Sequence, residues 1–82
     1  MGQYVGLNVS LKETSVCILD EDGVRLFEGK VPSEPGAIAR LIRRRAPDAV
    51  RVGLESGPTS GWLTRALVAE GLPAVCLEVA PF

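Results

Sequence analysis

Residues 4–10 read YVGLNVS, an apolar run of strand length on which the interpretation of the whole chain depends. Two further strand-like runs follow at 14–20 and 24–31, after short polar turns at 12–13 and 21–23. Gly23 stands where a tight hairpin turn needs a positive φ. The third run is more polar and alternates, which is typical of a strand near a sheet edge. The three runs therefore predict an antiparallel meander.

Two helices, each followed by a strand, are predicted in the rest of the chain. Ser33 has the character of an N-cap for a helix that ends near Arg45. Pro58 is suited to open a second helix that ends near Glu70, and Gly71 is placed to cap its C-terminus. The two strands are expected at 50–55 and 74–79.

The resulting order, β-β-β-α-β-α-β, predicts an α/β fold built on one mixed sheet. Strands joined by a helix prefer parallel pairing with a right-handed crossover. The simplest sheet has the order 3-2-1-4-5, with only the second strand antiparallel to the others. Cys17 and Cys76 would then lie on strands about three spacings of ~4.8 Å apart. Because a disulfide needs Cα atoms within ~7 Å, both thiols are expected to be free.

Composition limits the fold and the chemistry. The 82 residues are enough for one small domain, and their hydrophobic content of 46% is mainly aliphatic, as in sheets whose strands are buried on both faces. The net charge of −1 does not suggest a simple DNA-binding module. The absence of histidine excludes Ser-His-Asp triads and imidazole zinc sites. No signal peptide or membrane-length apolar run is found, so a cytoplasmic protein without a membrane partner is expected.

Two polar residues stand where apolar residues would pack better. Asn8 interrupts the central strand, and Glu55 ends the fourth strand. Because these strands are expected to be neighbours with their carboxyl ends at the same edge, the two side chains should converge. Two carboxylates there would form half of a two-Mg²⁺ site, but position 8 holds a neutral amide. The alternative is structural: Asn8 is satisfied by backbone, and Glu55 caps the helix that opens at Pro58.

A resemblance bears on these two positions. Residues 4–17, YVGLNVSLKETSVC, are similar to the opening of the IS-one-ten family of insertion-sequence transposases, which carry Asp in the place of Asn8. A second match is RVGLESGPTS, residues 51–60, followed by Trp62-Leu63 and by LPAVC at 72–76. The resemblance covers almost the whole chain, and both phrases are specific.

The resemblance implies a RuvC-like domain of the RNase H fold, of which residues 1–82 would be the N-terminal half. That domain binds Mg²⁺ through a DEDD carboxylate set, with Asn8 at the first Asp and Glu55 at the Glu. The last two Asp and a separate domain with a nucleophilic serine are not expected within this sequence. The family implies DNA and a guide RNA as partners. Catalysis by this chain alone is therefore not expected, and neither is bound Mg²⁺.

Weaker candidates for nucleic-acid contact are basic. Arg43, Arg44 and Arg45, with Arg40, cluster at the end of the first helix, where they would either complement the helix dipole or contact phosphates. Lys12, in the turn after the first strand, would approach a nucleic-acid backbone near the metal edge. Trp62 is expected to pack with Ala66 in the core or in an interface.

Two other classes of protein remain open. Sugar kinases and actin-like ATPases share the opening meander, but their first turn is rich in glycine, whereas residues 10–13 read SLKE. A non-catalytic assembly module is the other alternative. The fifth strand would leave a parallel edge uncovered, which predicts a homo-oligomer.

Overall fold

The computed structural model describes residues 2–55 and 59–77. All seven expected elements are present in the expected order, with ends that differ from the expected ones by a few residues at most. The elements are β1 (Gln3–Val9), β2 (Glu13–Asp20), β3 (Arg25–Pro32), α1 (Pro35–Arg45), β4 (Ala49–Glu55), α2 (Ser60–Ala69) and β5 (Ala74–Leu77). Two expectations, the opening of the second helix at Pro58 and the end of the last strand at Val79, concern residues outside the described ones.

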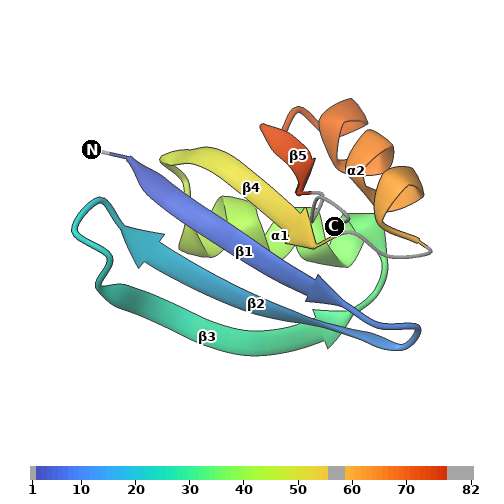
Figure 1. Cartoon of the computed structure of the whole chain (residues 1–82), viewed down its shortest axis with the longest axis horizontal. Helices are drawn as coiled ribbons and strands as arrows, with labels where there is room; N and C mark the ends of the chain where they lie inside the picture. The colour runs from blue at the N-terminus through green and yellow to red at the C-terminus, as the bar shows by residue number, and fades with distance from the viewer. Residues whose placement is uncertain (1, 56–58, 78–82) are drawn as a thin grey trace, which may run out of the picture.

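The five strands form one sheet in the order β3-β2-β1-β4-β5, as predicted (Figure 1). β2 is antiparallel to β1 and β3, whereas β1 pairs parallel with β4 and β4 pairs parallel with β5. β2 is therefore the only strand that runs against the others. Successive side chains of a strand point to opposite faces of the sheet, so apolar and polar side chains of β1 and β2 lie mostly on different faces.

The prediction that the strands are buried on both faces is wrong for the described part of the chain. α1 and α2 both pack against the same face, where they complete one core (Figure 1). The cause is topological. Both helices connect parallel strands, both crossovers advance in the same direction across the sheet, and right-handed crossovers of this kind lie on the same side. The opposite face carries no helix from the described residues.

The core lies between this single covered face and the two helices. Its sheet residues come from β1, β2, β4 and the first residue of β5, and its helical residues from one stripe on each helix. The largest of the fully buried side chains are Ile18, Ile38, Ile42, Leu54, Leu63 and Leu67. Within the described residues, no helix has the length and apolar character needed to span a bilayer.

The expected capping by Ser33 is wrong, because its hydroxyl has other partners. The N-cap of α1 is Glu34, and it makes no side-chain capping bond. Ser33 Oγ donates instead to the carbonyl of Ser10 at 2.6 Å and lies 2.8 Å from the hydroxyl of the fully buried Thr14. Since the one Ser33 hydrogen is used, Thr14 is the donor to Ser33. These bonds fasten the turn after β1 to the start of α1.

Gly23, which was predicted to need a positive φ, has one, and so does Gly71, the predicted C-terminal cap of the second helix. Gly23 has φ 82° in the β2–β3 turn, where the Asp20 carboxylate accepts from two backbone N–H groups at 2.9 Å. Gly71 has φ 87° just after α2. The N–H of Gly71 bonds to the Val68 carbonyl and that of Leu72 to the Leu67 carbonyl, which is the Schellman arrangement. These turns set the hairpin register and the direction of β5.

We predict that Leu54→Ala lowers the free energy of unfolding by about 2–5 kcal/mol, because Leu54 is fully buried at the centre of the single core. Leu11→Ala is the matched control, since Leu11 is 91% exposed and its truncation should change stability by less than about 0.5 kcal/mol. Urea unfolding followed by circular dichroism measures both. Similar losses for the two variants would contradict this description of the core.

Candidate functional site

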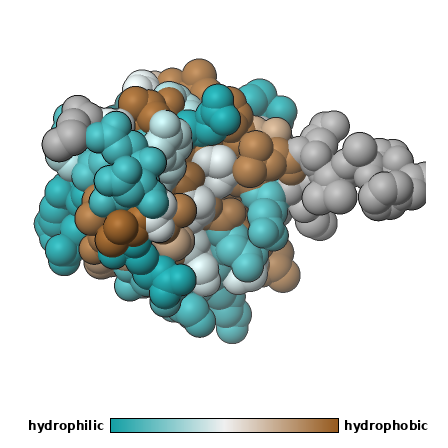
Figure 2. Space-filling view, turned by 60° about the vertical axis from the view of Figure 1, so that its left-hand side comes forward, coloured by the Kyte–Doolittle hydropathy of each residue, from teal (hydrophilic) through white to brown (hydrophobic). Residues whose placement is uncertain are grey.

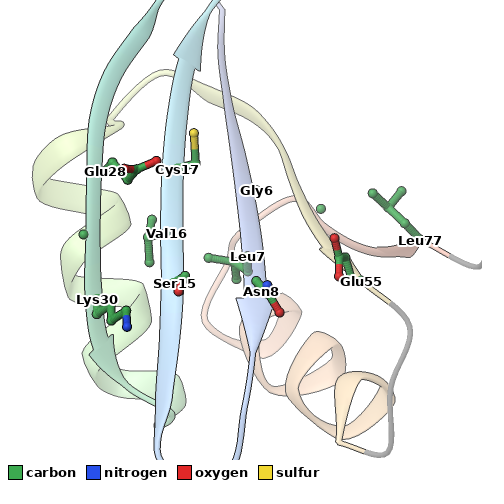
Figure 3. Close-up of a pocket in the computed structure, with 12 residues that line it drawn as sticks. Gly6, Leu7, Asn8, Ser15, Val16, Cys17, Glu28, Lys30, Glu55 and Leu77 are labelled. Carbon is green, nitrogen blue, oxygen red and sulfur yellow. The ribbon is translucent and has the colours of Figure 1, made fainter.

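Asn8 and Glu55 lie on neighbouring strands and line the same groove. The parallel register pairs Leu7 with Leu54, so Asn8 and Glu55 are the next residues along β1 and β4. Leu7 and Leu54 point into the core, and alternation therefore turns Asn8 and Glu55 to the open face. Figure 3 shows both side chains on this face, with the helices behind the sheet. The groove encloses about 570 Å³.

The floor of the groove is made by glycines. Gly6 of β1 is paired with Gly53 of β4, and these two residues lie between Cys17 of β2 and Val75 of β5. A Cβ added to Gly6 would come no closer to other atoms than 4.0 Å, which is ordinary contact, so the hollow arises from a missing side chain. Leu77 borders it on the other side, where its Cδ1 would lie 3.0 Å from a Cβ on Gly53.

A polar row crosses the open face beside this glycine floor. Lys30 of β3 is paired with Ser15 of β2, which is paired with Asn8 of β1, and Glu55 follows on β4. Lys30 and Ser15 also line the groove (Figure 3). Among the residues that the structure describes, the charged ones at the groove are Glu28, Lys30 and Glu55. The sequence reasoning missed Ser15 and Lys30, although the alternation of β2 and β3 would have placed them on the face of Asn8.

Neither Asn8 nor Glu55 is held by other side chains. Both are exposed, and within the described residues neither side chain makes a hydrogen bond or an ion pair. Asn8 is therefore not a buried amide in need of a partner, since it lies on the open face. The structural role considered for Glu55 also finds no support, because Thr59 is the N-cap of α2 and no side-chain capping bond is present there.

The oxygen donors of Asn8 and Glu55 fall short of what a two-metal site requires. Hard divalent cations are held by several charged oxygens. Here one carboxylate and one neutral amide stand side by side, and no group of three or more metal-binding residues exists among the described residues. The residues present therefore do not fit a two-metal centre. Asn8 and Glu55 as metal or catalytic residues remain a prediction from the resemblance.

The basic residues divide between the two ends of the sheet. Lys12 lies in the exposed turn after β1, at the end where Asn8 and Glu55 stand. Arg43, Arg44 and Arg45 lie at the C-terminus of α1, which leads into the start of β4 at the opposite end. The structure thus does not bring the arginine cluster to the groove.

Two arginines of this cluster have contacts within the domain. Arg43 donates to the carbonyl and to the carboxylate of Glu70, the latter at 3.2 Å, and so ties α1 to the end of α2. The Arg45 guanidinium lies 4.9 Å from the centre of the Phe27 ring. These contacts give Arg43 and Arg45 a structural role, and the contact of the cluster with nucleic acid remains a prediction.

Both cysteines are free, as expected. Cys17 lies at the groove, whereas Cys76 faces the helices and donates weakly to the Ser60 hydroxyl at 3.4 Å. Trp62 is 55% exposed and does not lie in the core, so of the two expected places only an interface remains a prediction. α2 buries Leu63 and Leu67 instead, which turns Trp62 toward solvent.

Comparison with known proteins shows similarity in structure only. No protein-family model and no curated protein sequence matches the chain. RuvC from Thermus thermophilus, solved in complex with a Holliday junction substrate, aligns over 95% of this chain with a TM-score of 0.66 and 10% identity. A second Thermus thermophilus RuvC structure aligns over 93% of this chain, with a TM-score of 0.61 and 13% identity. A ROK hexokinase from Thermus thermophilus also aligns over 93%, with a TM-score of 0.66 and 18% identity.

These similarities establish the fold. The mixed sheet in the order 3-2-1-4-5 has the RuvC-like RNase H fold, as the sequence predicted. The chain spans 65% of the RuvC chain in the Holliday junction complex and 35% of the hexokinase chain. At these identities the similarity carries no further information about activity.

We predict that Glu55→Gln leaves stability unchanged within about 0.5 kcal/mol, because the carboxylate is exposed and has no partner among the described residues. Asp20→Ala is the control, since its loss removes an acceptor from two backbone N–H groups and should cost about 1 kcal/mol. Thermal and urea unfolding of both variants provide the measurement. A loss of 1 kcal/mol or more for Glu55→Gln would show that Glu55 has a structural role.

Proposed function

We propose that this chain is the N-terminal part of a RuvC-like DNA transposase or recombinase of an insertion sequence, and that it does not cleave DNA by itself. Its place in the cell would be the cytoplasm. The fold it shares with RuvC supports the nuclease ancestry. The resemblance of residues 4–17 and 51–60 to insertion-sequence transposases supports the finer assignment.

One observation carries this proposal. Asn8 and Glu55, which the resemblance matches to the first two DEDD carboxylates, stand on adjacent parallel strands at the same edge of one groove. A role in packing would not require this arrangement, because both side chains are exposed. A metal-dependent ancestor would require it, since two carboxylates must converge to share a cation.

The lack of cleavage follows from charge. A unit charge ~4 Å from a divalent cation contributes roughly 2 kcal/mol even in water, which is about a 30-fold change in affinity. The neutral amide of Asn8 does not provide this attraction to the cation, so Glu55 is the single carboxylate of the pair. Such a site holds divalent cations too weakly to organise phosphodiester cleavage. The proposed role is therefore binding, with DNA and a guide RNA as partners.

A kinase-like function is the second candidate, because the ROK hexokinase has the same TM-score as RuvC. The turn after β1 argues against it. Phosphates are usually cradled by a loop of free backbone N–H groups. In this turn the N–H and the hydroxyl of Ser10 both donate to the Glu13 carbonyl, at 3.1 Å and 2.6 Å, and no glycine is present. Both donors of Ser10 are therefore used within the turn and are not free to bind a phosphate.

We predict that the unmodified chain binds Mg²⁺ or Mn²⁺ weakly and that Asn8→Asp tightens this binding by about 30-fold, because the new carboxylate lies beside Glu55 at the groove. Isothermal titration calorimetry measures the change. Ser15→Asp is the matched control: it adds the same charge to the same groove, but one strand farther from Glu55, and should have a smaller effect.

Two results would contradict the proposal. Equal effects of Asn8→Asp and Ser15→Asp would mean that positions 8 and 55 do not form a cation site. Binding of ATP at micromolar concentration would favour the kinase-like candidate instead.

We also propose that the chain self-associates through the edge of β5. This strand is only four residues long in the described part, and its other side pairs with β4. Val75 and Leu77 leave apolar surface beside that edge, at 40% and 50% exposure.

We predict a dimer or larger oligomer in sedimentation equilibrium at high protein concentration. Val75→Lys should shift the equilibrium toward monomer, because a charge on an edge strand opposes pairing with another chain. Val24→Lys, a change of an exposed valine in the β2–β3 turn, is the control. A monomer at all concentrations would exclude this mode of assembly.

A further inference from the structure

A second, smaller hollow lies at the same end of the sheet, on the side of the helices. It encloses about 120 Å³ and is bordered by the turn after β1 and by the first turn of α2. Leu11, Trp62 and the buried Leu63 contribute large apolar side chains, and Ser10, Ser33 and Thr59 contribute polar edges. Val9, which also borders the hollow, is the neighbour of Asn8 along β1.

The two apolar side chains are unusually accessible. Leu11 is 91% exposed and Trp62 is 55% exposed. Neither belongs to the core, which α2 reaches through Leu63 and Leu67. Figure 2 shows that apolar residues on the face it presents form separate patches among hydrophilic ones.

Two basic residues, Arg65 and Lys12, are neighbours of this pair along α2 and along the β1–β2 turn. Arg65 is three residues after Trp62, on the same face of α2, and its Nη1 would lie 3.6 Å from a Cβ on Gly61. Its guanidinium therefore extends back along the first turn of the helix. Lys12 follows Leu11 in the β1–β2 turn. Within the described residues neither cation has an ion-pair partner, and the first turn of α2 has no acidic residue.

We propose that Trp62 and Leu11 form a stacking site for one unpaired base of a single-stranded nucleic acid, with Arg65 and Lys12 on the flanking phosphates. Proteins bind single strands without sequence preference by stacking bases on aromatic side chains and by placing cations near the phosphates. A duplex fits poorly, since its base faces are hidden by stacking. The flanking cations favour a polyanion over an apolar protein segment. The proposal rests on the proposed function in taking nucleic acid as the partner.

Trp62 is the only tryptophan of the chain, so its fluorescence reports on this site directly. Titration with an oligothymidylate should quench the emission in a saturable manner, because a stacked base contacts the indole. An abasic oligonucleotide of the same length has the same phosphates and should bind more weakly without this quenching. Addition of salt should weaken the binding of both.

Variants test the same site by the anisotropy of a labelled oligonucleotide. Trp62→Ala should weaken binding on the order of tenfold or more, and Trp62→Phe should retain most of the affinity. Val68→Ala is the matched control, because Val68 is similarly exposed on α2 (53%) and should have no effect. Circular dichroism of each variant checks that the fold is intact.

The outcomes separate the stacking site from the proposed function. If duplex DNA binds and Trp62→Ala changes nothing, the stacking site is wrong and the proposed function stands. If neither single-stranded nor duplex nucleic acid binds, both fail. If the emission of Trp62 responds to protein concentration and not to oligonucleotide, the pair is a protein-docking surface and the proposal is overturned.

Discussion

The parallel pairing of β1 with β4 is the constraint on which the rest of the structure depends. It joins the antiparallel meander to the helical half of the chain and places the carboxyl ends of both strands at one edge. The same pairing fixes the crossovers of α1 and α2, which advance in one direction and so lie on one face. One covered face, one core and one open groove follow from this connectivity.

This arrangement separates stability from function. The core residues Val5, Leu7, Val52 and Leu54 point to the helices, while Asn8 and Glu55, in the same strands, point to the groove. Substitutions at positions 8 and 55 therefore change the chemistry of the groove without opening the core. The Leu11–Trp62 pair lies at the same end but on the other side of the sheet, so two surfaces of different chemistry meet at the edge.

Strand order, the positive φ of Gly23 and the cap at Gly71 could be predicted from the sequence, because hydrophobic periodicity, turn residues and the handedness of crossovers follow general rules. The rule of right-handed crossovers explains why both helices lie on one face. The prediction from composition, that the strands are buried on both faces, was wrong because it did not use this rule. Ser33 was misassigned because its hydroxyl bonds to Ser10 and Thr14, which are distant in sequence. Alternation along β3 gives the face on which Lys30 lies, but its place at the groove also depends on the register across three strands, which no local pattern contains.

The central claim is that positions 8 and 55 project toward one point, and disulfide cross-linking tests it most directly. In a chain with Cys17 and Cys76 replaced by serine, Asn8→Cys with Glu55→Cys should cross-link readily under mild oxidation, since adjacent strands lie about 4.8 Å apart. Lys30→Cys with Glu55→Cys, on the same face but about three strand spacings apart, should not. A failure of the first pair, or equal cross-linking of both pairs, would contradict the account.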